Sequence, residues 1–200
     1  YIMGAGDLVY ENLKSIGLDI ELININEIEN RYLDSFNTII MGIRAYNVNN
    51  GLNFKNKLLF DYVQRGGNLL IQYNTTRNLV TNKLTPFLLN LSRDRVTEED
   101  SPVKILTPLH RALNFPHKIT SEDFENWVQE RGLYFPNKWD KNFKPILSMN
   151  DKNENEKLGS LLIGNYGKGK VIYTGLSFFR QIPSGVTGAY RLLINLISLE

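Results

Sequence analysis

The chain has 200 residues, of which 42% are hydrophobic and 22% are charged, and such a chain is large enough to bury a globular core. These values exclude a disordered tail, a fibrous repeat and a disulfide scaffold. The absence of cysteine also excludes thiolate nucleophiles and thiolate metal sites. The formal net charge of +2 argues against a nucleic acid as partner. We expect no membrane span, because every apolar run is shorter than the roughly 20 residues that a span needs.

The chain opens on Tyr1–Met3 with neither an initiator methionine nor a signal peptide, so we expect a piece of a longer polypeptide. We interpret this opening as the end of a strand. A helix should follow it, capped by Asp7 and ended by Gly17. Alternating apolar residues then predict a second strand over Ile20–Ile25, and a short helix is expected over Ile28–Leu33.

Two apolar runs, Thr38–Ile43 and Asn68–Tyr73, have the length and continuous hydrophobicity of strands that are covered on both faces. Between them, the amphipathic stretch Phe54–Arg65 predicts a helix that Gly66-Gly67 ends. Strands that alternate with helices indicate βαβ units around a parallel sheet. We therefore predict that the two strands are adjacent, parallel and central in a doubly wound sheet.

Residues 74–121 are rich in polar and turn residues, and we expect them to decorate the framework. From Pro145 the pattern changes to strands, and a hairpin turn is expected at Gly167-Lys168-Gly169. The expected strands and the closing helix are, in order, Ile146–Met149, Leu158–Gly164, Lys170–Gly175 and Ala189–Ile197. Without a linker or an internal repeat, residues 1–200 are expected to form a single domain.

In an open α/β sheet, ligands bind beyond the carboxyl ends of the strands, where the loops converge. The first candidate loop, Gly4-Ala5-Gly6, lacks the third glycine of a dinucleotide fingerprint because Val9 stands there, so we interpret it as a tight turn. No cofactor is expected in this chain. The loops that this geometry singles out are Gly4–Asp7, Arg44–Asn50, Asn74–Asn78 and Ser177–Gly188.

The segment after Gly66-Gly67 resembles the nucleophile elbow of class I glutamine amidotransferase-like domains, with the ThuA-like branch as the nearest match. The small-x-nucleophile-x-small pattern of that elbow falls on Ile71, Tyr73 and Thr75. Tyr73 stands where the catalytic cysteine would have to be. A phenol of ordinary pKa about 10 supplies no nucleophile for covalent acyl transfer.

The resemblance to ThuA-like proteins continues along the chain through His110–Leu113, Glu130, Tyr134 and the hairpin Tyr166–Thr174. It implies a three-layer α/β sandwich of flavodoxin-like, class I glutamine amidotransferase-like type. In such a fold the central sheet is mostly parallel and carries a C-terminal β-hairpin.

Longer stretches are similar to the C-terminal region of large PIG-L (LmbE-like) deacetylases, mainly from Bacteroidetes. These stretches are Asn74–Arg77, Leu91–Thr97, Trp127–Phe135 and Tyr173–Arg180. The family's zinc domain, with its His-Pro-Asp-Asp motif, removes acetyl groups from N-acetylglucosamine-type sugars, and that motif is absent here. The resemblance implies a non-catalytic accessory or carbohydrate-binding module, with the deacetylase domain of the parent chain as partner. It also implies a periplasmic or cell-surface location.

For the ligand, we predict a neutral or weakly anionic glycan, because arginine, amide and aromatic groups match sugar hydroxyls and ring faces. In a strand, Arg93 and Arg95 would share a face that Asp94 opposes, either as solvated charges or as a substrate-facing pair. The aromatic residues Trp127, Tyr134, Phe135 and Trp139 suit either sugar stacking or the core. The ligand-binding candidates are Arg44, Tyr73, Asn74, His110, Glu130 and Arg131.

Two other classes of function stay open. His110 and Glu130 would be candidate catalytic residues, an acid–base pair of a sugar-acting hydrolase or isomerase, if the fold brings them together. Alternatively, the chain is a purely structural interaction domain. A metal site on His110 and His117 is disfavoured, because few carboxylates lie near them in sequence.

Overall fold

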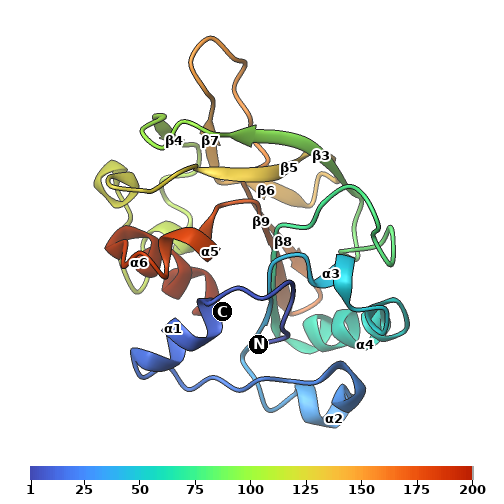
Figure 1. Cartoon of the computed structure of the whole chain (residues 1–200). Coiled ribbons are helices and arrows are strands. Elements are labelled where there is room, and N and C mark those ends of the chain that lie inside the picture. The colour runs from blue at the N-terminus through green and yellow to red at the C-terminus, as the bar shows by residue number, and fades with distance from the viewer. Residues whose placement is uncertain (200) are drawn as a thin grey trace.

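A computed structural model describes residues 1–199 of the chain (Figure 1). Its α-helices are α1 (Val9–Ser15), α2 (Asn30–Leu33), α3 (Ala45–Val48), α4 (Leu52–Arg65), α5 (Phe178–Gln181) and α6 (Thr187–Ile197). Short 3-10 helices are η1 (Ile25–Glu27), η2 (Arg111–Leu113) and η3 (Ser121–Phe124). The strands are β1 (Thr38–Met41), β2 (Asn68–Gln72), β3 (Leu89–Val96), β4 (Val103–Ile105), β5 (Gly132–Trp139), β6 (Phe143–Pro145), β7 (Leu147–Met149), β8 (Leu161–Tyr166) and β9 (Gly169–Thr174).

The central sheet has the strand order β1-β2-β9-β8-β6 among the described residues. Strands β1, β2 and β9 are parallel, whereas β8 and β6 run antiparallel to their neighbours. The sheet is therefore mixed, and the expectation of a mostly parallel sheet is not confirmed. The hairpin that joins β8 to β9 through Gly167-Lys168 lies where it is expected.

The predicted strands Thr38–Ile43 and Asn68–Tyr73 are β1 and β2, which are adjacent and parallel as expected. Strand β2 is central, but the prediction that β1 is also central is wrong. Beyond β1 lies only the opening segment of the chain, where Ile2 forms an isolated bridge to Met41. This opening segment is too short to act as a full strand, so β1 is the last named strand of the sheet.

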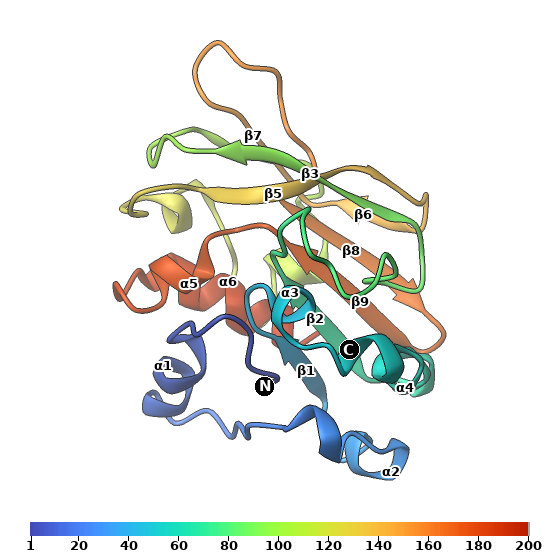
Figure 2. The ribbon, with the colours of Figure 1, turned by 45° about the vertical axis from the view of Figure 1, so that its right-hand side comes forward.

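Side chains of the sheet alternate between two hydrophobic clusters. Ile40, Leu70 and Ile172 pack in one cluster with residues of α1 and α6. Their neighbours, such as Leu69 and Val171, pack in the other cluster with residues of α4. Helices thus cover both faces of the sheet, as the two views show (Figures 1 and 2), and the chain has a mixed α/β fold.

The predicted helices correspond to α1, α2, α4 and α6. The N-cap of α1 is Leu8 rather than the expected Asp7. Asp7 lies one residue earlier, and its Oδ1 accepts a hydrogen bond from the backbone N–H of Val9 at 3.0 Å. The strand predicted over Ile20–Ile25 is wrong. Residues 20–24 form no strand, and Ile25 begins η1. The carbonyl of Tyr1 accepts from the N–H of Ile23, and its amino group donates to the carbonyl of Glu21.

The segment after β2 also differs from the expected elbow, because no helix follows the strand and residues 73–88 are irregular. Side chains here compete with helical hydrogen bonds. The N–H of Thr75 donates to Oδ1 of Asn47 at 2.9 Å, and Oγ1 of Thr75 donates to the carbonyl of Arg77 at 3.0 Å. The first contact binds the segment to the loop after β1, and the second is a local side-chain contact within the segment.

The middle of the chain is more than decoration, because it contributes strands to two small antiparallel sheets, β3–β5 and β4–β7. Strand β5 crosses the carboxyl end of β9, where the N–H of Leu133 donates to the carbonyl of Gly175 at 2.8 Å. This close approach of β5 to Gly175 requires glycine at position 132, since a Cβ there would lie 2.3 Å from the carbonyl oxygen of Gly175. The β3–β5 ribbon therefore covers this edge of the central sheet (Figure 2).

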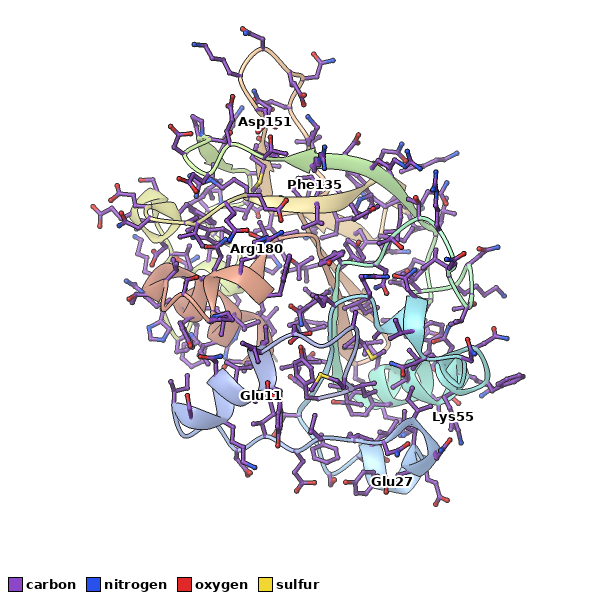
Figure 3. All side chains as sticks on the ribbon, in the orientation of Figure 1. Glu11, Glu27, Lys55, Phe135, Asp151 and Arg180 are labelled. Carbon is purple, nitrogen blue, oxygen red and sulfur yellow. The ribbon has the colours of Figure 1, made fainter. Side chains whose placement is uncertain are left out.

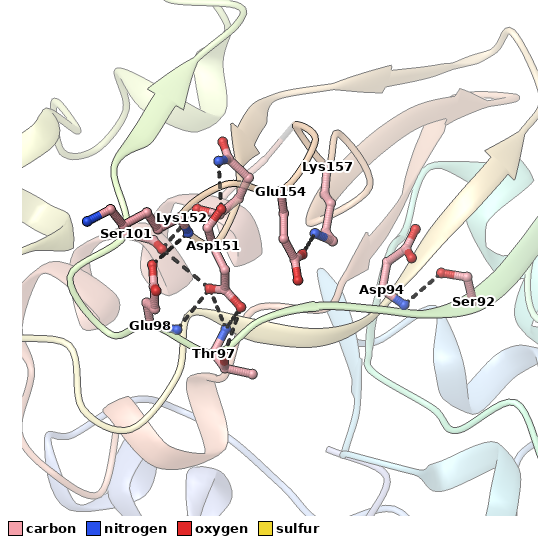
Figure 4. A network of polar contacts seen from close by, with 10 residues as sticks. Ser92, Asp94, Thr97, Glu98, Ser101, Asp151, Lys152, Glu154 and Lys157 are labelled. Carbon is pink, nitrogen blue, oxygen red and sulfur yellow. Dashed lines mark hydrogen bonds and ion pairs between the residues drawn. The ribbon is translucent and has the colours of Figure 1, made fainter.

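A polar network fastens the β7–β8 connection to the end of β3 (Figure 4). The carboxylate of Asp151 accepts hydrogen bonds from the backbone N–H groups of Thr97 and Glu98, and Glu98 in turn accepts from the N–H of Lys152. Burial raises the pKa of Asp151, but the hydrogen bonds from Glu98 and Thr97 outweigh it and hold that pKa below its ordinary value. The network thus joins the end of β3 to the connection that leads into β8 of the central sheet.

Candidate functional site

A cavity of about 280 Å³ lies at the carboxyl ends of β1 and β2, where the covering ribbon meets the loops. This position agrees with the rule for open α/β sheets. We call it the arginine pocket, after the three arginines among the residues that line it: Arg44, Asn47, Thr75, Thr76, Arg77, Asn78, Arg93 and Tyr134.

Arg44 and Tyr73 are neighbours, as expected where the loops after adjacent parallel strands converge. The backbone N–H of Arg44 donates to the carbonyl of Tyr73 at 2.8 Å, so the loops after β1 and β2 lie side by side. The next residue inward, Ile43, donates its N–H to the buried carboxylate of Asp7 at 3.1 Å. The Gly4–Asp7 turn therefore holds the backbone from which Arg44 projects.

Two asparagines join the loops. The fully buried Asn74 accepts a hydrogen bond from the N–H of Tyr46 at 2.9 Å and donates one to the carbonyl of Gln72 at 3.0 Å. Asn47 donates to the carbonyl of Arg77 at 2.8 Å. Asn74, predicted as a ligand contact, therefore serves to position the loops, whereas Asn47 both positions them and lines the pocket.

Three residues of the pocket have left-handed backbone conformations: Arg44 (φ 56°), Asn78 (φ 58°) and Tyr134 (φ 52°). This conformation costs of order 1–3 kcal/mol for a residue with a bulky side chain, although asparagine tolerates it better. Such outliers gather at functional sites, where the surrounding structure imposes them. Their presence in one small cavity marks the pocket as the best candidate site.

Aromatic rings form one wall of the site. Tyr134 lines the pocket and stacks on Tyr73, with ring centroids 5.9 Å apart and planes at 8°. Tyr73 is only 7% exposed and also packs against Phe179 at 5.3 Å. Of the two tyrosines, Tyr134 is thus the one placed to meet a ligand, with Tyr73 supporting it from behind.

Burial raises the pKa of Tyr73, and the nearby Arg44 opposes the shift without reversing it. The phenol is therefore protonated at neutral pH and can donate a hydrogen bond, but it is not a phenolate nucleophile. Tyr73 thus does not replace the cysteine of an amidotransferase elbow by acting as an ionised nucleophile.

Glu130 lies close enough to raise the pKa of Tyr73, but its carboxylate is already paired. Nε of Arg180 donates to Oε1 of Glu130 at 2.6 Å, and the guanidinium also lies over the ring of Phe179 at 4.8 Å. Figure 3 shows Arg180 between α5 and β5. Glu130 therefore supports the aromatic wall from behind the pocket.

His110 lies elsewhere. The charges that act on its ring are those of Lys144 and Lys170, and Lys170 lies at the start of β9. Glu130 lies beyond the opposite end of that strand, where its carbonyl accepts a hydrogen bond from the hydroxyl of Ser177. A strand of this length separates its two ends by roughly 17–20 Å, so the structure does not bring the acid–base pair together.

The ring of His110 has a structural task, because its Nδ1 accepts the N–H of Ala112 at 3.1 Å and caps η2. Burial lowers the pKa of His110, and Lys144 and Lys170 add to the effect. The folded state therefore favours the neutral ring, so the stability that this ring contributes is present above the ordinary pKa of about 6.5 and is lost as the pH falls below it.

We expect His110→Asn, which retains a capping acceptor but does not titrate, to reduce the loss of unfolding free energy between about pH 7.5 and about pH 5.5. Urea unfolding of both proteins at both pH values measures the difference, which should reach at most about 1 kcal/mol. His117→Asn is the control, since the ring of His117 makes no side-chain hydrogen bond within residues 1–199. Equal pH dependence in wild type and His110→Asn would contradict the assignment.

Arg131 is 5% exposed and faces the interior. Its Nε donates to the carbonyl of Ser101 at 3.0 Å, Nη1 donates to the carbonyl of Phe124, and the guanidinium lies 5.8 Å from the ring of Trp127. Burial lowers the pKa of Arg131 to about 10, against the opposing effect of Asp100 and Glu99. The group is still charged at neutral pH, and its contacts are those of a structural residue.

Sequence reasoning found Arg44 and the 74–78 loop but did not select the other pocket residues as site residues. Arg77 lies in that loop, and the sequence offers Arg93 only as one of a possible pair with Arg95. The structure separates the pair, since Arg93 lines the pocket and Arg95 does not. Register shifts between Leu91 and Val96 interrupt the alternation on which the pairing depended.

Within residues 1–199, no group of three or more His, Asp or Glu side chains is arranged to hold a metal ion. In the same part of the chain, no helix has the length and apolar character required to cross a bilayer.

No protein-family model matches the chain, and no curated protein matches it. A cytoplasmic protein from Salmonella typhimurium has a similar structure, with 15% identity and a TM-score of 0.61 over 94% of this chain and 84% of that one. A second cytoplasmic protein, from Salmonella typhimurium LT2, is 17% identical with a TM-score of 0.60 over 98% and 86% of the two chains.

A cold-adapted β-galactosidase from Rahnella sp. R3 is 14% identical, with a TM-score of 0.58 over 96% of this chain and 26% of that one. The chain therefore matches only about a quarter of that β-galactosidase. The TM-scores show that the fold is shared. Because the identities are this low, the function must be argued from the site.

Proposed function

We propose that the chain is a non-catalytic carbohydrate-binding module, accessory to a PIG-L-type deacetylase domain, and that it binds a glycan in the arginine pocket. The observation that carries the proposal is the composition of that pocket. It combines the half-buried aromatic ring of Tyr134 with amides, hydroxyls and guanidinium groups. Sugars offer apolar ring faces and many hydroxyls, which such groups match.

The position of the PIG-L-like stretches supports the proposal. Asn74–Arg77 and Leu91–Thr97 contribute arginines to the pocket, and Trp127–Phe135 contributes Tyr134. Tyr173–Arg180 supplies Phe179 and Arg180 behind the aromatic wall. Segments that lie far apart in the sequence thus meet at one site, as expected if the resemblance reflects a shared binding surface.

We also propose that the fold is the flavodoxin-like, class I glutamine amidotransferase-like type, of the ThuA-like branch. Its support is the parallel group β1-β2-β9 with a C-terminal hairpin, and Tyr73 at the end of a buried strand. The same fold forms part of a β-galactosidase chain, so it also occurs within a larger enzyme. A parent chain of PIG-L type would place the module in the periplasm or at the cell surface.

A titration of the chain with a panel of neutral and acidic oligosaccharides, by NMR or calorimetry, tests the binding function. We expect dissociation constants of micromolar to millimolar order, because each hydrogen bond gained replaces one to water and contributes only about 0.5–1.5 kcal/mol. The panel should include N-acetylglucosamine oligomers. Absence of saturable binding by every member would refute the proposal.

Tyr134→Ala should weaken glycan binding roughly fivefold or more, since an aromatic contact contributes about 1 kcal/mol or above. Tyr32→Ala serves as the matched control, because Tyr32 is exposed and does not line the pocket. Circular dichroism and urea unfolding establish that each variant is folded. Equal affinity of Tyr134→Ala and wild type would contradict the assigned stacking face.

A further inference from the structure

The arginine pocket has an unusual charge. Arg44 follows β1, Arg77 follows β2 and Arg93 belongs to β3, so three separate segments bring guanidinium groups to one cavity. No aspartate or glutamate lines it among the described residues. A cavity of about 280 Å³ thus concentrates positive charge in a chain whose net charge is only +2.

These arginines also lack partners. Some arginines elsewhere form ion pairs, as Arg180 does with Glu130 and Arg191 does with Asp123. By contrast, the guanidinium groups of the three pocket arginines make no hydrogen bond or ion pair with any residue of 1–199. Like charges that converge without a counter-ion repel one another. An anion between them would relieve that repulsion and accept charge-assisted hydrogen bonds.

We propose that the glycan bound here carries an oxyanion substituent, a carboxylate, sulfate ester or phosphate ester, which Arg44, Arg77 and Arg93 hold while the Tyr134 ring contacts the sugar face. The inference rests on the proposed function and narrows its ligand class from neutral or weakly anionic glycans to acidic ones. The planar, forked donors of arginine fit all three oxyanions.

The gathering of positive charge at one cavity distinguishes this ligand from an extended polyanion. A groove that follows a nucleic-acid backbone requires positive charge along its length. Here the unpaired arginines gather at one cavity instead, beside an aromatic ring. The arrangement therefore suits one charged group on a sugar unit.

Matched pairs of oligosaccharides test the inference. The probes are hyaluronan and oligogalacturonate tetrasaccharides with their carboxyl-reduced counterparts, a chondroitin sulfate tetrasaccharide with its desulfated form, and mannose 6-phosphate with mannose. We expect at least one acidic member to bind about tenfold tighter than its neutral counterpart, the factor expected from one charge-assisted hydrogen bond. The pair that shows this difference identifies the oxyanion. Its affinity should fall as salt is raised from about 0.05 M to about 0.5 M, because salt screens exposed charges.

Arginine variants test whether the pocket arginines cause the preference for the acidic oligosaccharide. Arg77→Gln and Arg93→Gln should each weaken binding of the acidic member about tenfold and leave its neutral counterpart nearly unchanged. Arg95→Gln is the matched control, because Arg95 is exposed on the same strand as Arg93 but does not line the pocket. Unfolding curves for the three variants should coincide with that of the wild type.

The outcomes separate the inference from the proposed function. If neutral and acidic members bind equally, or if Arg95→Gln weakens binding as much as Arg93→Gln does, the inference is overturned and glycan binding stands. If only neutral sugars bind, the inference is likewise overturned. If no member of any pair binds, both fail.

Discussion

Replacing Asp7 by alanine should lower the free energy of unfolding by about 3–5 kcal/mol, because three buried donors would lose one charged acceptor. The carboxylate is 6% exposed. It accepts the hydroxyl of Tyr1 at 2.6 Å, the N–H of Val9 at 3.0 Å and the N–H of Ile43 at 3.1 Å. One side chain thus joins the opening of the chain, the start of α1 and the loop after β1.

Urea unfolding followed by circular dichroism measures this loss. Asp7→Asn, which retains an oxygen acceptor but loses the charge, should fall between wild type and Asp7→Ala. Asp19→Ala is the control, because Asp19 is exposed, and it should change stability by less than about 0.5 kcal/mol. A loss below about 1 kcal/mol for Asp7→Ala would show that the opening turn does not depend on this carboxylate.

Replacing Arg131 by methionine should cost about 2–4 kcal/mol of stability, because the carbonyls of Ser101 and Phe124 would lose their donor. Methionine keeps much of the apolar volume of the side chain, so the loss reports chiefly on the hydrogen bonds. Glycan affinity of the folded variant should equal that of the wild type. Sequence reasoning had instead placed Arg131 on the ligand-binding face.

Unfolding curves and a glycan titration below the unfolding transition measure the two effects separately. Arg95→Met provides the control, since Arg95 is exposed and its side chain makes no hydrogen bond within residues 1–199. If Arg131→Met were as stable as the wild type and lost glycan binding, Arg131 would be a ligand contact, as the sequence alone suggested.

The parts of the fold that could be predicted are those specified by local pattern. Continuous apolar runs identified β1 and β2 as neighbouring parallel strands, and helical spacing identified α4 and α6. The β3–β5 ribbon could not be found this way, because its strands are far apart in the chain and pair with register shifts between Asn90 and Val96. Strand pairing of this kind depends on contacts between distant segments, which the pattern of one segment does not reveal.

In the candidate site, too, the features set by local pattern could be predicted and those set by long-range contacts could not. The loops that hold Arg44 and Arg77 were predictable, because loops at the carboxyl ends of adjacent parallel strands converge. The contacts that each charged side chain makes could not be predicted in this way. Glu130 and Arg131 are neighbours in sequence, yet one pairs with Arg180 and the other serves backbone carbonyls in the interior. Their partners come from segments that only the folded chain brings near.

The left-handed backbone at Arg44, Asn78 and Tyr134 would preorganise the pocket for the glycan proposed above. The loops hold their conformation in the free protein, so a ligand that fits has little further ordering free energy to supply, and association then loses less conformational entropy than it would with a mobile loop. The same feature limits stability, because the folded state carries the strain whether or not a ligand is bound. At this edge of the sheet the strained backbone therefore lowers stability, and the proposed binding would gain from the same strain.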